Sequence, residues 1–435
     1  MNSCAPTTPR TRNSNPLDGT RRWRLPGAAC FSIIRVMLTP AEAESLIGQH
    51  LAALPIESLP LSQAVGAILR ENIYGERDAP PFDRVAMDGV AVRSEVIARG
   101  VRRLTVQGMQ PAGATPMTLG SETNCIEIMT GAMLPSGCDA VIPVEQISVA
   151  DGIATLAPDV KIEAYRNVHR RGSDARQGAL LLSTGACLNP PDIAVAASAG
   201  MARVRISAQP AIVVISTGDE LVEPGESILP YQVRRSNVYG VVAALKARGF
   251  TRVADDHVND DADEIERRLR QHLATHDTVI LSGGVSMGQL DLVPQVLERL
   301  GVRQIVHKIA QRPGKPMWFG VAPSGAAVFA LPGNPVSTLV CLGRYVVPAL
   351  NRAMGASERA PERLALLQAV ETRNALTFFL PVQLQTDGWG RTWAQPRPTN
   401  GSGDFTALAG TDGFVELPPG PAELPKGFVA TLYRW

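Results

Sequence analysis

Two segments in the second half of the chain each place an apolar strand directly before a glycine-bearing turn. They are DTVILSGGVSMG at 277–288 and LPGNPVS at 331–337. In α/β sheets such turns point backbone N–H groups at an anion beyond the carboxyl end of the strand. In the second motif Asn334 is predicted to cap a helix, with Pro335 at its first position. The two motifs therefore predict a parallel α/β domain that binds a phosphate-bearing ligand.

Charged residues around these motifs indicate what the domain does with its ligand. Three cations lie in HKIAQRPGKPMWFG, where prolines stiffen the loop: Lys308, Arg312 and Lys315. Four acids each follow a predicted strand or its turn: Glu220, Asp260, Asp261 and Asp291. Because the carboxyl ends of parallel strands meet at one edge of a sheet, we expect these acids to converge there. Cations for phosphate and acids for a hard metal predict Mg²⁺-dependent phosphate chemistry.

Composition excludes some classes of function. The 435 residues contain 42 Lys plus Arg and 41 Asp plus Glu, so net charge gives no support to a nucleic-acid partner. The six cysteines form no CxxC pair and no zinc or haem spacing, which favours the reducing cytoplasm. The longest apolar stretch, at 328–350, is interrupted by LPGNP and Arg344. It predicts a buried strand and helix, and no membrane span.

The pattern of the chain changes several times, which predicts several domains. Residues 37–78 and 172–207 carry helical patterns, two of them within 39–72, and are predicted to form an elongated helical connector domain. Residues 79–171 contain short β-rich runs and predict an inserted β-domain. Strands and helices alternate in 208–355, as in a parallel sheet with right-handed crossovers. Residues 356–435 return to short strands, which predict a small β-barrel or sandwich.

The first 36 residues differ from the rest of the chain. They contain one acid, Asp18, and six arginines, at positions 10, 12, 21, 22, 24 and 35. An organellar transit peptide is one interpretation. The preferred one takes Met37 as the natural start, because Thr39 and Pro40 open a helix there. Residues 1–36 are then a disordered or untranslated extension.

Six motifs give the chain a resemblance to a known family. They are AMDG at 86–89, MTGA at 129–132, STGDEL at 216–221, SGGVSMG at 282–288, RPGKP at 312–316 and LPGNPVS at 331–337. In this order and spacing they resemble the MoeA family, the molybdopterin molybdenumtransferases, with gephyrin-type proteins as eukaryotic relatives. The resemblance covers residues 37–435, and its collinearity is more specific than any single motif. It implies a central α/β domain of the molybdopterin-binding type and a small C-terminal β-barrel.

The resemblance also implies a reaction and its residues. Molybdate is inserted into adenylylated molybdopterin with Mg²⁺, and AMP is released. The implied metal ligands are Glu220, Asp260 and Asp291, and the catalytic set adds Asp88, Thr130 and Lys308. The implied cofactor-binding residues are Gly283, Gly284, Ser286, Arg312, Lys315, Pro316, Gly333, Asn334 and Ser402. The implied partners are a second copy in a homodimer, a molybdopterin adenylyltransferase, and apo-molybdoenzymes or their chaperones.

Some of these residues have simpler interpretations. Asp88 precedes Gly89 as turn residues often do, and Thr130 beside Gly131 could only bond local backbone. His272 and His276 lie four apart and could chelate a metal, but with no third ligand nearby they are predicted to be surface histidines. Cys341 is predicted to be a packed thiol.

The chain departs from the family pattern in its C-terminal part. The family usually has an arginine there that helps to hold molybdate, and Leu380 and Pro381 stand at that place. A nearby cation, Arg391 or Arg397, could substitute. Alternatively the chain is a divergent paralogue that binds the cofactor without efficient insertion. Arg235 is a second departure, since an acid or amide is more usual two residues before Asn237.

Three functions from different classes follow. The first is the molybdenum insertase. The second is a gephyrin-type binding or scaffolding protein, which long linkers would favour, and the chain lacks these beyond residue 36. The third is an adenylyltransferase acting one step earlier, which the α/β domain alone would allow and the flanking domains argue against.

Overall fold

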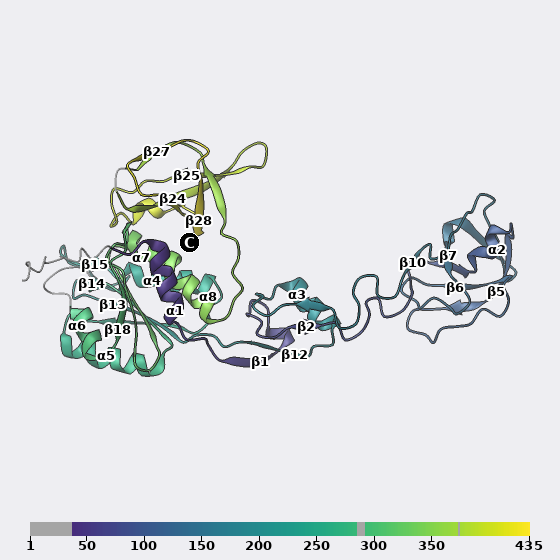
Figure 1. Cartoon of the computed structure of the whole chain (residues 1–435), viewed down its shortest axis with the longest axis horizontal. Helices are drawn as coiled ribbons and strands as arrows, with labels where there is room; N and C mark the ends of the chain where they lie inside the picture. The colour runs from purple at the N-terminus through teal and green to yellow at the C-terminus, as the bar shows by residue number, and fades with distance from the viewer. Residues whose placement is uncertain (1–36, 285–291, 373–374) are drawn as a thin grey trace, which may run out of the picture. The chain divides into compact units, whose positions relative to one another are not determined.

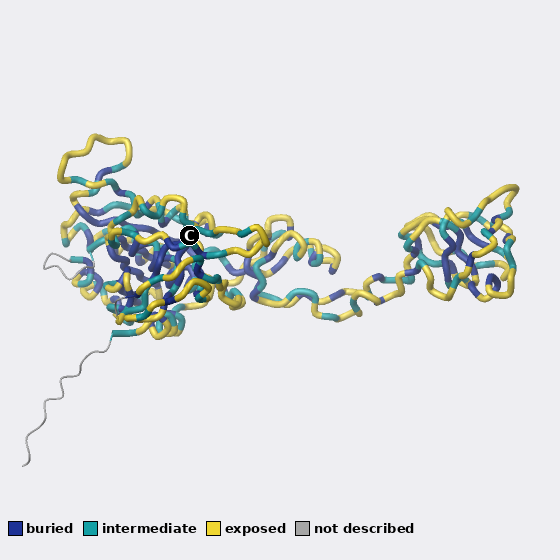
Figure 2. The backbone as a smooth tube through the Cα atoms, turned by 90° about the horizontal axis from the view of Figure 1, so that it is seen from above, coloured by how far each residue is buried: buried dark blue, intermediate teal, exposed yellow. Residues whose placement is uncertain are grey.

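The computed structural model describes residues 37–284, 292–372 and 375–435. Figure 1 shows the helices and strands of these residues, and Figure 2 shows that buried residues gather inside separate cores. The described part of the chain contains no helix that is both long and apolar enough to span a membrane.

The α/β domain is built on a six-stranded sheet in the order β16–β13–β17–β21–β20–β18. Four strands are parallel: β16 (Val253–Val258), β13 (Ile212–Thr217), β17 (Thr278–Ser282) and β21 (Ala327–Leu331). The last two, β20 (Trp318–Val321) and β18 (Arg303–His307), run antiparallel to their neighbours. The prediction of a parallel sheet is therefore correct for the half that carries the glycine turns and wrong for the other edge. There the hairpin 303–321 is too short for a helical crossover.

Helices cover both faces of this sheet, and alternate strand residues face each layer. Val213 and Ile215 pack with α5 (Ala262–Thr275) and α6 (Leu292–Arg299). Ile212 and Val214 pack on the other face. That face is covered by α1 (Pro40–His50), α4 (Ser236–Ala247), α7 (Pro335–Cys341) and α8 (Val347–Ala353), with a π-helical turn, Leu342–Val346, between the last two.

Helix α1 begins as the sequence predicts but belongs to a different core. Thr39 caps it in a complete capping box, and Pro40 occupies the first turn. Its buried residues Ala43 and Ile47 lie in the core of the α/β domain, so the helix does not join the connector as expected. The second helical pattern in 39–72 is also wrong. Residues 56–60 form strand β1 (Ile56–Pro60), which pairs with β12 (Arg203–Ser207), far along the chain.

The connector is thus a mixed α/β unit, where a helical one was predicted. Besides β1 and β12 it contains β2 (Ile73–Tyr74), β11 (Leu180–Leu182) and α3 (Pro190–Ser198). Asn189 caps α3 in a second capping box. Leu69, Leu188 and Val204 lie in its own core.

The β-domain contains a six-stranded sheet in the order β7–β4–β6–β5–β9–β8. Its strands are β4 (Gly89–Val92), β5 (Arg103–Gln110), β6 (Asn124–Ile128), β7 (Ala140–Pro143), β8 (Ile147–Ala150) and β9 (Ile153–Leu156). Helix α2 (Ser94–Ala98) packs on this sheet through Val96 and Ile97. The short pair β3 (Arg84–Val85) and β10 (Val168–His169) lies where the chain enters and leaves the domain.

The C-terminal residues form a closed five-stranded barrel. The strands β24 (Thr377–Thr386), β25 (Thr392–Pro396), β22 (Arg363–Leu366), β28 (Val429–Arg434) and β26 (Gly413–Leu417) pair in this order, and β26 returns to β24. A sixth strand, β19 (Gln311–Arg312), comes from the α/β domain and adds to β24 in parallel. Phe379 and Phe414 of the barrel pack on Val336 and Val340 of α7.

A buried arginine in the π-helical turn connects three elements. The side chain of Arg344 is 5% exposed. Its Nη1 donates to Glu44 Oε2 in α1 at 2.7 Å, and its Nε donates to Glu416 Oε2 in β26 at 3.0 Å. Although burial disfavours the charge, Tyr433, Glu416 and Glu44 outweigh it and raise the pKa of the guanidinium above its ordinary value. Arg344 therefore links α1 and the barrel to the π-helical turn between α7 and α8.

Candidate functional site

The two glycine motifs lie side by side at one edge of the sheet. Gly283 N donates to Leu331 O at 3.2 Å, and a Cβ on Gly333 would lie 3.5 Å from Gly283 Cα. Asn237 of α4 spans both turns, since its Nδ2 donates to Ser282 Oγ at 3.0 Å and to Gly333 O at 2.7 Å. The two turns thus form one surface at the carboxyl ends of β17 and β21. Ser286, predicted to bind the cofactor, lies outside the described residues.

Three acids gather at the same edge, after the neighbouring strands β13 and β16. Asp260 N donates to Asp219 Oδ1 at 3.0 Å. Burial, followed by the charges of Asp219 and Glu220, raises the pKa of Asp260. The carboxylate of Glu220 folds back over Gly218, where a Cβ would lie 2.4 Å from its Oε2. Negative charges held this close disfavour each other's ionisation, and a bound cation would relieve that repulsion.

Asp261 is separate from this cluster. Its side chain caps α5, with Oδ1 accepting from Asp263 N at 3.1 Å and from Glu264 N at 2.8 Å. Asp291, the third predicted metal ligand, lies outside the described residues. Within 37–284, 292–372 and 375–435, no three His, Cys, Asp or Glu side chains form a ready metal site. Glu220 and Asp260 alone still fit Mg²⁺, which proteins often hold by one or two carboxylates together with substrate phosphates.

Arg235 is a buried cation near the acid-bearing turn that follows β13. Its side chain is 6% exposed and bonds Glu223 Oε1 at 2.5 Å and Asp255 Oδ2 at 2.9 Å. Its Nε also donates to Ser216 Oγ at 2.7 Å, beside the acid-bearing turn. The unusual arginine at this position is therefore a structural cation that fixes the end of β13.

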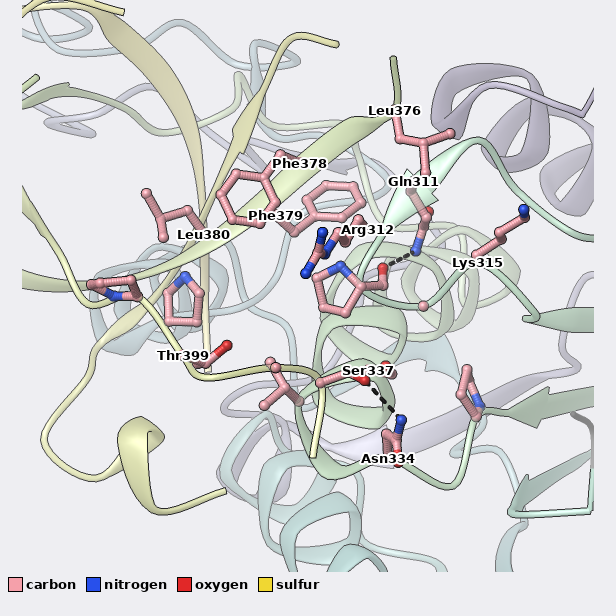
Figure 3. Close-up of a pocket in the computed structure, with 18 of the residues that line it drawn as sticks. Gln311, Arg312, Lys315, Asn334, Ser337, Leu376, Phe378, Phe379, Leu380 and Thr399 are labelled. Carbon is pink, nitrogen blue, oxygen red and sulfur yellow. Dashed lines mark hydrogen bonds between the residues drawn. The ribbon is translucent and has the colours of Figure 1, made fainter. Parts of the chain in front are cut away.

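A cavity of about 610 Å³ lies between the α/β domain and the barrel. Figure 3 shows Arg312 and Lys315 on one side of it and Asn334 below. The barrel contributes Leu380 and Pro381 from β24 and Ser402 from a loop. Predicted cofactor-binding residues from both halves thus meet here: Arg312, Lys315, Pro316, Asn334 and Ser402.

Asn334 occupies the N-cap position of α7 and Pro335 opens the helix, as predicted, but the capping bond from the Asn334 side chain is absent. The Asn334 side chain makes no capping bond, and its Nδ2 donates to Ser402 Oγ at 2.7 Å. Val336 N donates to Ser402 O at 3.1 Å. Asn334 therefore joins the glycine motif to the barrel, which a local capping rule does not anticipate.

Lys308 is on the same loop as Arg312, but it is not among the described residues that line the cavity. Its N–H bonds Met317 O at 3.1 Å, and its backbone is left-handed, with φ 66°. Such a conformation is uncommon for a residue with a side chain and often marks a functional position.

Asp88 and Thr130 form a pair in the β-domain. Thr130 N and Oγ1 both donate to Asp88 Oδ1, at 2.6 and 2.8 Å. These two hydrogen bonds lower the pKa of the Asp88 carboxyl. Gly89 is required for a steric reason, because a Cβ there would lie 1.9 Å from Ile142 O. Glu220 and Lys308 belong to the α/β domain, and the described contacts of this chain do not bring them to Asp88 and Thr130.

Two predictions about other side chains have clear outcomes. His272 is not a surface histidine, because its side chain is 13% exposed and its Nε2 lies 2.7 Å from Asp256 Oδ2. Cys341 is the packed thiol expected, and burial raises its pKa. Gln311 in the cavity wall was not predicted, because an amide beside RPGKP belongs to no motif.

Comparison with known proteins agrees with this geometry. Three family models match the chain: the MoeA N-terminal region (domain I and II) at residues 38–200, a probable molybdopterin binding domain at 213–352, and the MoeA C-terminal region (domain IV) at 363–435. The chain belongs to the MoeA family. A curated relative from Synechocystis, named molybdopterin molybdenumtransferase, is 38% identical over 92% of this chain and 100% of its own length. One of the same name from Staphylococcus epidermidis is 30% identical over 89% and 93%.

Solved structures of MoeA proteins have the same fold. The molybdopterin biosynthesis MoeA protein of Pyrococcus horikosii superposes with a TM-score of 0.76 at 31% identity, covering 92% of this chain and 99% of its own. The predictions of family and of a transferase are confirmed. The adenylyltransferase hypothesis is not supported, because MoeA regions flank the α/β domain on both sides.

Proposed function

We propose that this chain inserts molybdate into adenylylated molybdopterin in an Mg²⁺-dependent reaction that releases AMP. The observation that carries the proposal is the cavity in which Arg312 and Lys315 lie beside Asn334 of the glycine motif LPGNPVS. The acids follow neighbouring strands of the same sheet. The names of the relatives support molybdopterin and molybdenum as substrates.

Each group of residues has a role in this proposal. Arg312 and Lys315, exposed on a loop with buried anchors, hold the tetrahedral oxyanion, which one cation in water binds weakly. The turns with Gly283, Gly284 and Gly333 hold the pyrophosphate, with Ser286 as a further donor. Asn334 and Ser402 fix the barrel loop against that turn.

The acids would hold Mg²⁺, with Glu220 and Asp260 as ligands and Asp291 as the third. When bound, Mg²⁺ supplies positive charge that stabilises the phosphate oxygens during hydrolysis of the adenylate. Asp88 accepts two hydrogen bonds from Thr130 and so stays ionised, as a carboxylate that positions a ligand or a proton must. Lys308 contributes a further cation on the loop.

The test is release of AMP from adenylylated molybdopterin by the purified protein. We expect AMP only when both Mg²⁺ and molybdate are present, because the acids require the cation and transfer requires the oxyanion. Omission of each in turn, measured by chromatography of the nucleotide, provides the control. Release that is independent of molybdate would contradict the proposal and favour a cofactor-binding paralogue without insertase activity.

The structure favours Arg397 over Arg391 as the substitute for the missing arginine. Arg397 N donates to Pro381 O at 2.8 Å, and its Nη2 donates to Gln383 Oε1 at 2.5 Å. The residues that follow it, Pro398 and Thr399, line the cavity. Arg391 is paired with Asp387 at 3.3 Å near the hairpin turn. Arg397 is therefore the cation beside the position that Pro381 occupies.

We expect Arg397→Gln to raise the half-saturating molybdate concentration about tenfold, as for loss of one charge-assisted bond of about 1.5 kcal/mol. Arg391→Gln is the matched control and should leave it unchanged. Pro381→Arg should restore molybdate affinity in the Arg397→Gln protein. Equal molybdate dependence of all these variants would show that neither arginine contacts the oxyanion.

We also propose a homodimer in which the β-domain of one subunit and the α/β domain of the other share a site. Asp88 and Thr130 are exposed on the β-domain, whereas Glu220 and Asp260 are exposed on the α/β domain, and each domain has a core of its own. Asp88→Ala and Asp260→Ala chains, each inactive, should regain up to about a quarter of wild-type activity when unfolded and refolded together. Random pairing makes half the dimers mixed, each with one intact site. A mixture as inactive as its parents would refute the shared site.

The remaining partners follow from the reaction. A molybdopterin adenylyltransferase would supply the substrate, and apo-molybdoenzymes or their chaperones would take the product, in the cytoplasm.

A further inference from the structure

The loop that carries Arg312 and Lys315 alternates buried and exposed residues. Gln311 is 0% exposed, and Pro313 and Gly314 are also buried, whereas the two cations face outward. Flexible cations bind an anion well only if something fixes the backbone that carries them. The buried residues between the cations are where such a constraint must act.

Gln311 is the centre of a closed hydrogen-bond network. Its Nε2 donates to Pro313 O at 3.0 Å, a bond drawn in Figure 3, and to Cys341 Sγ at 3.6 Å. Its Oε1 accepts a hydrogen bond from the Tyr345 hydroxyl. The contact with Pro313 determines the amide orientation, because the reverse orientation would place two acceptors, Gln311 Oε1 and Pro313 O, against each other.

Two residues of the helix after LPGNP complete the network. The thiol of Cys341 donates to Gly314 O at 3.7 Å, and Tyr345, 1% exposed, lies in the π-helical turn. Gly314 has φ 92°, and a Cβ there would lie 2.5 Å from Cys341 Sγ. The carbonyl of Gly314 is thus held by Cys341, and that of Pro313 is held by Gln311, whose amide oxygen accepts from Tyr345.

The rest of the loop is constrained by backbone bonds. Met317 N donates to Gly314 O at 3.1 Å, and Ile309 N donates to Lys315 O at 2.9 Å. Gln311 and Arg312 also pair with Thr377 and Phe378 of β24. These backbone bonds fix the two ends of the loop and reach Gly314 O, and the Gln311 network adds side-chain bonds to Pro313 O and Gly314 O.

We propose that Tyr345, Gln311 and Cys341 are positioning residues that hold Arg312 and Lys315 in the geometry that binds the tetrahedral oxyanion. The inference rests on the proposed function and deepens it, by assigning part of the oxyanion affinity to buried side chains that act through Arg312 and Lys315. In a low-dielectric interior, a satisfied network of this kind fixes one arrangement, and removal of one member leaves another polar atom without a partner.

The test compares two tyrosine-to-phenylalanine variants in the full chain. Tyr345→Phe removes the hydroxyl that donates to Gln311. Tyr433→Phe removes the hydroxyl that donates to Glu416 Oε2 at 2.8 Å, and this bond does not involve the loop. Two quantities are measured: hydrogen exchange of the peptide 308–317, and the molybdate dependence of AMP release. If Tyr345→Phe fails to fold, Cys341→Ala takes its place, because it removes the donor to Gly314 O.

We expect Tyr345→Phe to speed exchange at Ile309 and Met317 and to raise half-saturating molybdate roughly threefold to tenfold. Turnover at saturating molybdate should stay within about twofold, since no group that touches the reacting atoms is changed. Tyr433→Phe should match wild type in both measurements.

Two outcomes overturn the inference: identical behaviour of both variants, or faster loop exchange with unchanged molybdate dependence. If the wild-type protein releases no AMP with molybdate, the proposed function fails by itself. Hydrogen exchange of the peptide 308–317 then tests, without the activity measurement, whether the network positions the loop.

Discussion

Asp260→Asn should lower molybdate-dependent AMP release by at least about a hundredfold while binding of molybdopterin is retained. The change keeps the shape of the side chain and removes one charge from the acid cluster, so a bound divalent cation loses a ligand and the transition state loses several kcal/mol of stabilisation. Turnover and pterin affinity are measured separately, by nucleotide release and by fluorescence titration.

Asp261→Asn is the matched control for this experiment. Asp261 is adjacent in sequence, but its carboxylate caps α5, and asparagine caps a helix about as well. Thermal stability should be unchanged or higher in Asp260→Asn. The folded protein raises the pKa of Asp260, so it binds that proton more tightly than the unfolded chain, and the ionised form costs stability at neutral pH. Equal loss of turnover in both variants would remove Asp260 from the site.

Arg344→Met should destabilise the protein by about 3 kcal/mol, at the lower end of the range for breaking a buried ion pair. The variant leaves Glu44 and Glu416 facing a methionine, and both carboxylates are only partly exposed. The loss should appear in calorimetry as a lower Tm for the α/β domain and barrel.

Arg352→Met provides the comparison for Arg344→Met. Arg352 pairs with Glu358 at 2.9 Å, but both side chains are exposed, so its loss should cost less than about 1 kcal/mol. Similar Tm values for the two variants would show that the charge of Arg344 contributes little, and that the barrel is held mainly by Val336, Val340, Phe379 and Phe414.

Local signals in the sequence predicted much of the fold. The cap at Thr39 and the glycine turns after β17 and β21 depend on neighbouring residues, and all are seen. Strand β1 was predicted as a helix, because its pairing with β12 joins residues about 150 apart, as for Ile56 and Ser207. Such pairing leaves no mark in a short window of sequence.

The candidate site likewise has parts that the sequence predicts and parts that depend on contacts between distant residues. The convergence of Glu220, Asp260 and the glycine motifs follows from the order of parallel strands, which sequence alone can suggest. The contact of Asn334 with Ser402 and that of Gln311 with Tyr345 join residues 68 and 34 positions apart. These contacts depend on how the barrel and the helices pack on the sheet. A local rule therefore assigned Asn334 to a cap and found no role for Gln311.

Strand β19 couples the α/β domain to the barrel. Because Gln311 and Arg312 complete the edge of β24, the loop that carries the cations is also a strand of the barrel. An oxyanion in the cavity would contact both parts, and any ligand that binds only the docked arrangement raises the free energy of undocking. The substrate should therefore act as a clamp between the barrel and the sheet. Without the barrel, the cavity would lose the wall formed by Leu380, Pro381 and Ser402 and would no longer enclose a ligand.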